Sequence, residues 1–200
     1  MKGRLVEKDR LIAFFDALLA IIMTVLVLEL KKPDPISWEG LWAIRGDLFA
    51  YVASFFWLSA LWSSNNAEWD YVRVIDRRVV WWVLVFLFFT SLVPYATSLL
   101  SNSFYDPFPQ AFYGMVIVMT AATNMFLYSS LIKADKDNGT LRHFTKFNRS
   151  IMPVDFAIKA CGLIVSLVFW APAASVSVII AAGVVLGHLL IQHRSSRLID

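Results

Sequence analysis

The stretch 9-DRLIAFFDALLAIIMTVLVLELKKPDP-35 decides how the whole chain is interpreted. It is a long apolar run with basic residues at both ends, and about twenty apolar residues in a helix cross the hydrocarbon core of a bilayer. Asp16 interrupts the run near its start. An acid inside such a segment needs a partner or a function, because burying a charge in lipid is costly. The stretch therefore predicts a membrane helix and makes Asp16 the first residue to explain.

The composition of the chain extends this interpretation to its whole length. Of the 200 residues, 58% are hydrophobic and 16% are charged, whereas a soluble domain is about half apolar and about a quarter charged. The excess apolar residues stand in runs long enough to span a bilayer. We predict an all-α, polytopic membrane protein whose single domain (1–200) has six transmembrane helices: Leu11–Leu30, Asp47–Trp62 with an extension to Asn66, Val79–Leu100, Ala111–Ile132, Val154–Trp170 and Ala174–Ile191.

The distribution of Lys and Arg predicts the orientation. With a cytoplasmic amino terminus, fourteen of the 18 basic residues fall in cytoplasmic segments, three (Lys31, Lys32 and Arg45) fall outside, and Lys159 lies just inside the fifth span. Cytoplasmic loops are the ones enriched in Lys and Arg, so we expect both termini to be cytoplasmic. The polar stretch Lys133–Arg149 is expected to be a cytoplasmic loop. The basic residues form no aromatic-rich cluster, so no nucleic-acid partner is expected.

Enzyme motifs are missing from the sequence. It contains no GxSxG, HExxH, P-loop or CxxC pattern, and these are the arrangements that would indicate a nucleophile, a metal or a bound phosphate. The three histidines, His143, His188 and His193, do not form a ligand cluster. We therefore expect neither an enzyme nor a cofactor.

Helical geometry separates Asp16 from the rest of its segment. At about 100° per residue, Ala17, Ile21, Thr24 and Leu28 share one stripe, and Asp16 lies about 140° from Ile21. The acid and the stripe therefore face different surroundings. The stripe could contact lipid, pack in the core or line a pore. Asp16 could fix helix packing or touch a permeant ion, and its angular position favours packing against another helix.

The second predicted span offers partners for that acid. Its cytoplasmic end should lie at the depth of Asp16, and it carries Trp62, Asn65 and Asn66, all of which can donate hydrogen bonds to a carboxylate. The alternative is that these residues simply lie in the inner headgroup region.

Other polar or irregular positions carry weaker signals. Asp155 and Lys159 are spaced as an i, i+4 pair, which favours mutual neutralisation over a ligand site. Pro94 should bend the third span. Gly183 and Gly187 form a GxxxG pattern, which signals close helix packing but arises often by chance.

The first span resembles the first-helix signature of prokaryotic homologues of transmembrane protein 175, the endolysosomal potassium channel family. That signature runs Arg, three residues, Phe-Ser-Asp, an alanine-rich turn and Ile-x-x-Thr, and it is matched here by Arg10, Phe14, Asp16, Ile21 and Thr24. The second span is similar too, with Ser54-Phe55 followed by Trp62. Phe15 replaces the usual serine, and Asn65-Asn66 stands where the family often has His-His.

The resemblance implies a potassium-permeable leak channel in the plasma membrane of a prokaryote. Its subunits would form a homotetramer in the lipid bilayer, with four copies of the first helix around a central pore. Ile21 and Leu28 would form apolar rings, and Thr24 would contribute to potassium preference. Potassium would be the only bound species, as a transient permeant ion. The helix-packing network would comprise Arg10, Phe14, Asp16, Trp62, Asn65 and Asn66.

Two other classes of function stay open. A proton-permeable channel or a secondary transporter could use Asp16, although no inverted repeat is visible in the sequence. A membrane scaffold without transport is the second alternative.

Overall fold

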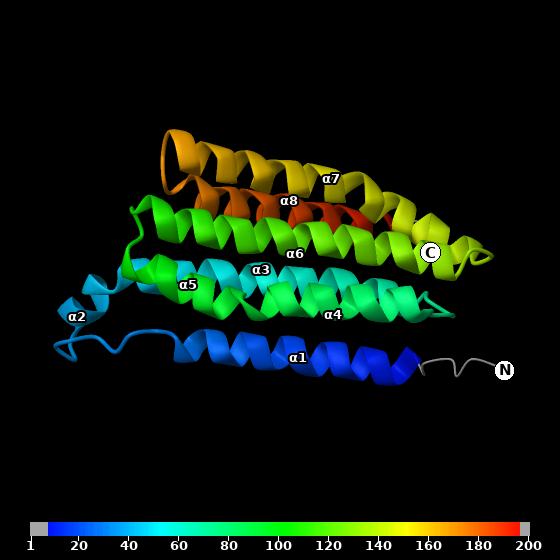
Figure 1. Ribbon diagram of the computed structural model, residues 1–200, viewed down its shortest axis with the longest axis horizontal. Coiled ribbons are helices and arrows are strands. Elements are labelled where there is room, and N and C mark those ends of the chain that lie inside the picture. The colour runs from blue at the N-terminus through cyan, green and yellow to red at the C-terminus, as the bar shows by residue number, and fades with distance from the viewer. Residues whose placement is uncertain (1–7, 197–200) are drawn as a thin grey trace.

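The computed structural model describes the backbone of residues 8–196, and the side chains there except those of residues 102, 144, 146–150, 186 and 188–196. The described chain is a bundle of helices that run side by side, and the chain reverses direction between neighbouring long helices, whereas α5 continues in the direction of α4 (Figure 1). Their bounds are α1 Lys8–Leu28, α2 Trp38–Ala43, α3 Arg45–Trp69, α4 Arg77–Ser91, α5 Val93–Asn102, α6 Pro107–Ala134, α7 Gly139–Val168 and α8 Ala173–Ser196. The predicted all-α fold is confirmed.

Four helical segments are long and apolar enough to cross a membrane: Lys8–Leu28, Arg77–Ser101, Pro107–Ala134 and Ile151–Val168. The apolar part of α8, Ala173–Val185, is shorter. Helix α3 is not among them, because it carries more polar and acidic residues, and several of those are buried against its neighbours. The second, fourth and sixth predicted spans lie within α3, α6 and α8, and the third lies within the consecutive helices α4 and α5. The first and fifth predicted spans each extend two residues beyond the end of their helix, α1 at Leu28 and α7 at Val168.

The third predicted span is broken where the sequence placed its bend. Helix α4 ends at Ser91 and α5 begins at Val93, with Pro94 in the first turn of α5. Proline has no N–H to donate and disfavours the helical turn before it. Thr90 and Ser91 donate their hydroxyls to carbonyl oxygens of the preceding turn, those of Phe86 and Phe88. The bend predicted at Pro94 is therefore confirmed.

The prediction of a loop over Lys133–Arg149 is wrong. Helix α6 continues to Ala134 and α7 begins at Gly139. The Asn138 side chain caps α7 by accepting a hydrogen bond of 3.0 Å from the backbone N–H of Leu141. A polar composition does not exclude a helix here, because a helix that extends beyond the membrane can be polar on every exposed face. Helix α2 was not predicted either, and it begins after Ser37, whose hydroxyl accepts from Gly40 N–H.

Hydrogen bonds join two short connections, the one between α3 and α4 and the one between α6 and α7. The Asp135 carboxylate accepts from the backbone N–H of Arg73 and from the Asn138 amide, both at 2.8 Å. The same amide donates to the Tyr71 carbonyl at 2.7 Å. Burial alone would raise the pKa of Asp135, but these hydrogen bonds and the Arg73 charge outweigh it and hold the pKa below its usual value. The α3–α4 and α6–α7 connections are thus fastened to each other.

Close packing of α7 on α8 occurs at Gly162 and not at the GxxxG pattern. A methyl group added at Gly162 would collide with the side chain of Ser177 on α8. One added at Gly183 or Gly187 would meet no described atom within 4 Å. Among the described atoms, the GxxxG pattern therefore marks no close contact.

Helices α1 and α7 lie on opposite sides of the bundle (Figure 1). Among the described elements, α1 contacts α3, α4 and α5 only, whereas α7 contacts α6, α8 and α3. Helix α1 begins and α8 ends at the same end of the bundle. The position of α1 at the edge leaves one of its sides without a neighbour.

Candidate functional site on the open face of α1

Helix α1 has one packed face and one open face. The packed face is formed by Leu11, Phe15, Leu19, Ile22 and Leu26, each at most 6% exposed. The open face is apolar as well, and its larger members include Phe14, Ile21 and Leu28. An apolar face that nothing in the subunit covers, on a helix suited to crossing a membrane, must meet either lipid or another copy of the chain.

The open face contains the stripe that the sequence singled out. Ile21 is 55% exposed and Leu28 is 79% exposed. Ala17, one turn before Ile21, and Thr24, between Ile21 and Leu28, are exposed as well. The Thr24 hydroxyl donates a hydrogen bond of 2.7 Å to the carbonyl oxygen of Ile21 in its own helix. This bond fixes the direction of the hydroxyl on an otherwise apolar surface.

Asp16 lies on the flank of α1, where the indole Nε1 of Trp62 donates a hydrogen bond of 2.9 Å to its Oδ1. Trp62 comes from α3, the neighbour that the sequence proposed for this acid. Asp16 is half-buried and therefore faces α3 rather than the open stripe. The bond connects α1 and α3 across their interface.

The other proposed partners do not join Asp16. Among residues 8–196, Arg10 and Asn66 make no hydrogen bond or ion pair to it, and Asn65 donates to the Leu61 carbonyl of its own helix at 2.9 Å. The reasons are geometric. Arg10 precedes Asp16 by six residues, about 120° around the helix and about 9 Å along it. Asn65 is buried on another face of α3, and Asn66 lies about one helical turn beyond Trp62.

Phe15, and not Phe14, anchors α1 in the bundle. Phe15 is fully buried and stacks on Phe86 of α4, with ring centroids 5.5 Å apart. It also meets Trp69 of α3 edge-on at 6.0 Å. Phe14 is 45% exposed and, seven residues before Ile21, lies on the same open stripe. Phe15, the residue that departs from the family signature, therefore packs α1 inside the subunit, and the role of Phe14 in a helix-packing network stays a prediction.

A buried polar cluster, which sequence analysis missed, connects α5 to α3 and α6. The Ser54 hydroxyl on α3 lies 2.9 Å from Thr97 Oγ1 on α5 and 3.1 Å from the Tyr113 hydroxyl on α6. All three residues are at most 4% exposed. Single hydroxyl residues in apolar runs give little signal in the sequence, because their partners come from other helices.

A groove beside Ile21 separates α1 from the bend between α4 and α5. Its volume is about 390 Å³, and its lining includes Leu18, Ile22, Leu87, Phe88 and Pro94. The apolar surface around Ile21 therefore continues from α1 onto α4 and the start of α5. Within residues 8–196, no three His, Cys, Asp or Glu side chains gather as they would around a metal ion.

Comparisons with known proteins identify relatives of this chain. The family model described as endosomal/lysosomal potassium channel TMEM175 matches residues 10–94. A potassium channel of Chryseobacterium sp. (strain P1-3) is 33% identical over 153 residues, which are 76% of this chain and 80% of that protein. A potassium channel of Streptomyces collinus (strain DSM 40733 / Tue 365) is 32% identical over 100 residues, 48% of each chain.

The fold has a solved counterpart. The crystal structure of a lysosomal potassium-selective channel TMEM175 homolog from Chamaesiphon minutus superposes with a TM-score of 0.69 at 22% identity, covering 92% of this chain and 97% of that one. This likeness extends to α7 and α8, beyond the residues that the family model matches.

Proposed function

The chain belongs to the TMEM175 family, and from this premise we propose that it is a potassium-permeable leak channel of a prokaryotic plasma membrane. The observation that carries the proposal is that one apolar face of α1 is left uncovered by the subunit. The stripe that the family resemblance assigns to a pore is also the face that the subunit leaves uncovered, with Ile21 and Leu28 more than half exposed.

Four subunits would assemble with their α1 helices around a common axis. The packed face of α1 holds each helix on its own subunit, and the open face is turned toward the axis. A single subunit cannot enclose a pore, because α1 has neighbours on one side only. The tetramer therefore supplies the missing walls. Potassium is the permeant species, and no other cofactor is needed.

The pore would select through rings of side chains rather than through backbone carbonyls. Ile21 forms the narrow apolar ring and Leu28 a second one, and such constrictions can gate by dewetting. Thr24, three residues after Ile21, places four hydroxyls about 4.5 Å along the axis. Potassium holds its water less tightly than sodium and loses part of its shell more easily at a narrow ring. The Thr24 oxygens would partly replace that water.

In the proposed orientation the chain crosses the membrane six times, and both termini lie in the cytoplasm. The support for this orientation is the arrangement of charges. The end of the bundle at which α1 begins and α8 ends also carries the connections that contain Arg73 and Lys136, and the start of α4 with Arg77 and Arg78. Cytoplasmic segments are those enriched in Lys and Arg.

A pathway through Asp16 is the less favoured function. Its carboxylate is engaged by Trp62 and lies on the flank of α1, away from Ile21. A proton channel or transporter that used this acid would need it free to face the permeant species. The geometry instead fits a packing anchor.

Ion flux in reconstituted liposomes tests the proposal. Liposomes that contain the purified chain and a potassium gradient should lose potassium without any added stimulus, whereas protein-free liposomes should hold it. A native mass measurement on the same preparation should find tetramers. A monomer that shows no flux would contradict the channel. Flux of protons with none of potassium would transfer the proposal to the Asp16 alternative.

A further inference from the structure

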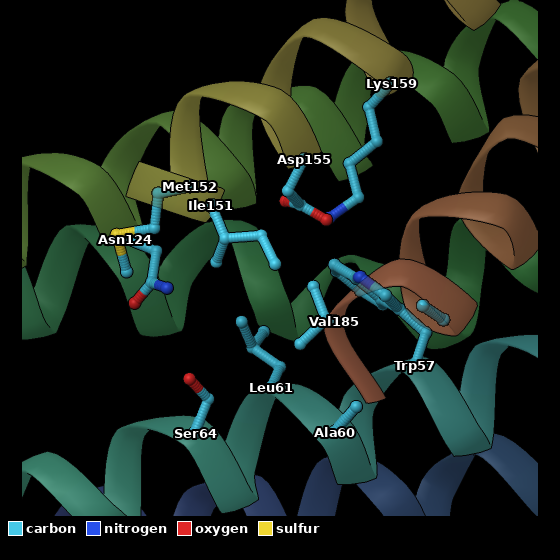
Figure 2. Close-up of a pocket in the computed structure, with 11 residues that line it drawn as sticks. Trp57, Ala60, Leu61, Ser64, Asn124, Ile151, Met152, Asp155, Lys159 and Val185 are labelled. Atoms are coloured by element: carbon cyan, nitrogen blue, oxygen red, sulfur yellow. The ribbon is translucent and has the colours of Figure 1, made fainter. Parts of the chain in front are cut away.

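A second polar site lies inside the subunit, away from α1. Figure 2 shows a cavity between α3, α6, α7 and α8. Its volume is about 50 Å³. The polar and aromatic residues that line it are Trp57 and Ser64 from α3, Asn124 from α6, and Asp155 and Lys159 from α7. The remaining lining is apolar and includes Leu61 and Val185.

An ion pair forms one end of the cavity. The Lys159 ammonium lies 2.6 Å from Asp155 Oδ2, and the two side chains are 3% and 16% exposed. The mutual neutralisation predicted for this pair is thus confirmed. The ammonium also lies over the Trp57 ring, 5.1 Å from its centroid. An ammonium has three N–H donors, and the Asp155 oxygen accepts only one of them.

A buried amide stands elsewhere in the lining. Asn124 is 6% exposed, and its Oδ1 accepts no hydrogen bond from any described group. Leaving a buried acceptor unsatisfied is destabilising, because the hydrogen bond that it made to water in the unfolded chain is not replaced. Donors without a partner at Lys159 and an acceptor without a partner at Asn124 therefore border the same space.

We propose that this cavity is an internal hydration site that binds a small cluster of water molecules between the Lys159–Asp155 pair and Asn124. Water can both accept from the ammonium and donate to the amide oxygen, which no single rigid ion can do. A cavity of this size has room for roughly two waters, since each occupies about 30 Å³ in the liquid. Larger organic molecules do not fit, and a metal cation would be repelled by the Lys159 charge.

The position of the site explains why water is needed there. Lys159 and Asp155 belong to the apolar segment Ile151–Val168, which is long enough to cross a membrane. Lipid cannot solvate the remaining hydrogen-bonding groups of the pair. Helix α1 contributes nothing to the lining, so this proposal stands independently of the pore proposed above.

Radiolytic footprinting of the whole protein in detergent or nanodiscs tests the site. Short X-ray pulses convert water into hydroxyl radicals, which oxidise aromatic side chains next to bound water even where bulk solvent is excluded. Trp57 is 3% exposed and lines the cavity, whereas Tyr113 is 1% exposed and lies in the hydrogen-bonded cluster with Ser54. Trp57 should gain oxygen several-fold faster than Tyr113. Equal slow oxidation of both residues would overturn the proposal.

Two variants make the test specific. Ala60→Val adds two methyl groups to the α3 wall of the cavity, and Asn124→Leu keeps the side-chain size while removing the amide. Each should lower the oxidation of Trp57 several-fold and leave that of Tyr113 unchanged, in protein whose helical circular dichroism and elution volume match the parent. Trp57 oxidation that persists at the parental rate in both folded variants would also reject the site. If one variant misfolds, the other and the parental comparison still decide.

Discussion

The indole of Trp62 and the carboxylate of Asp16 meet at 2.9 Å across the interface between α3 and α1. Together with Phe15, which packs between Phe86 and Trp69, this bond sets the rotation of α1 about its own axis. That rotation decides which residues remain on the open face. An acid that looked out of place in an apolar run therefore has a structural explanation.

Removal of the Trp62–Asp16 bond should weaken the attachment of α1. We predict that Trp62→Phe and Asp16→Ala each lower the free energy of unfolding by about 1 kcal/mol, because a hydrogen bond between the two side chains is lost at a half-exposed site. The double variant should lose less than the sum of the two. Denaturant unfolding in detergent measures all three. Strictly additive losses would mean that the two side chains do not interact. An Asp16→Ala variant of normal stability but altered ion selectivity would return the acid to the pore.

The neighbouring phenylalanines of α1 should behave differently. Phe15→Ala should cost about 3–5 kcal/mol of unfolding free energy, since it empties a buried aromatic contact. Phe14→Ala should cost under about 0.5 kcal/mol in the subunit, because its side chain is half exposed. The same unfolding assay compares them. Similar losses for both would place the buried face of α1 one residue away.

Ile21 should control the width of the proposed pore. Replacing it with asparagine puts an amide of similar size at the constriction and wets it, so single-channel conductance should rise several-fold in planar bilayers. Val27→Asn is the matched control. Val27 is 45% exposed but lies about 120° from Ile21 around the helix. Conductance that responds to Val27 and not to Ile21 would move the pore to another face.

Thr24 should contribute selectivity rather than stability. Thr24→Val keeps the shape and removes the hydroxyl, so the permeability ratio of potassium to sodium should fall a few-fold while tetramers still form. Thr24→Ser keeps the oxygen and should retain most of the preference. Reversal potentials under bi-ionic conditions give both ratios. An unchanged ratio in Thr24→Val would assign selectivity elsewhere.

Asp135 should make the subunit sensitive to acid. Its pKa is lowered in the folded protein from the ordinary value of 3.8, so its carboxylate stabilises the fold fully above that value. This contribution declines as pH falls through the lower, folded pKa. Asp135→Asn should cost about 1 kcal/mol at neutral pH and should flatten the acid limb of the stability curve. The unfolding midpoint measured from neutral to acid pH checks both effects. An acid limb identical to that of the parent would show that other carboxylates dominate it.

Several features were accessible from the sequence because their signals are local. Hydrophobic runs reveal helices directly, and Pro94 breaks one by its own covalent geometry. The pairing of Trp62 with Asp16 followed from matching depths on adjacent antiparallel spans. Lys159 and Asp155 stand one turn apart and find each other in any helix.

The remaining features depend on neighbours that are distant in the sequence. Phe14 and Phe15 are chemically identical, and only the positions of Phe86 and Trp69 decide which is buried. Asn124 looks like one more polar residue in an apolar run until α7 places the ion pair across from it. The helix over 139–150 could not be predicted from its polar composition, because composition indicates contact with solvent and not the conformation of the backbone.

The hydrogen bond from Thr24 to the Ile21 carbonyl has a consequence for the sign of charge that the proposed tetramer admits. That bond commits the only hydroxyl hydrogen of Thr24 to the helix backbone. The oxygen lone pairs are then the polar feature left toward the axis. Four such oxygens would form a collar that offers acceptors and no donors, so anions would find nothing there to replace their hydration water. Discrimination against chloride would arise in this way without a single formally charged residue on the stripe.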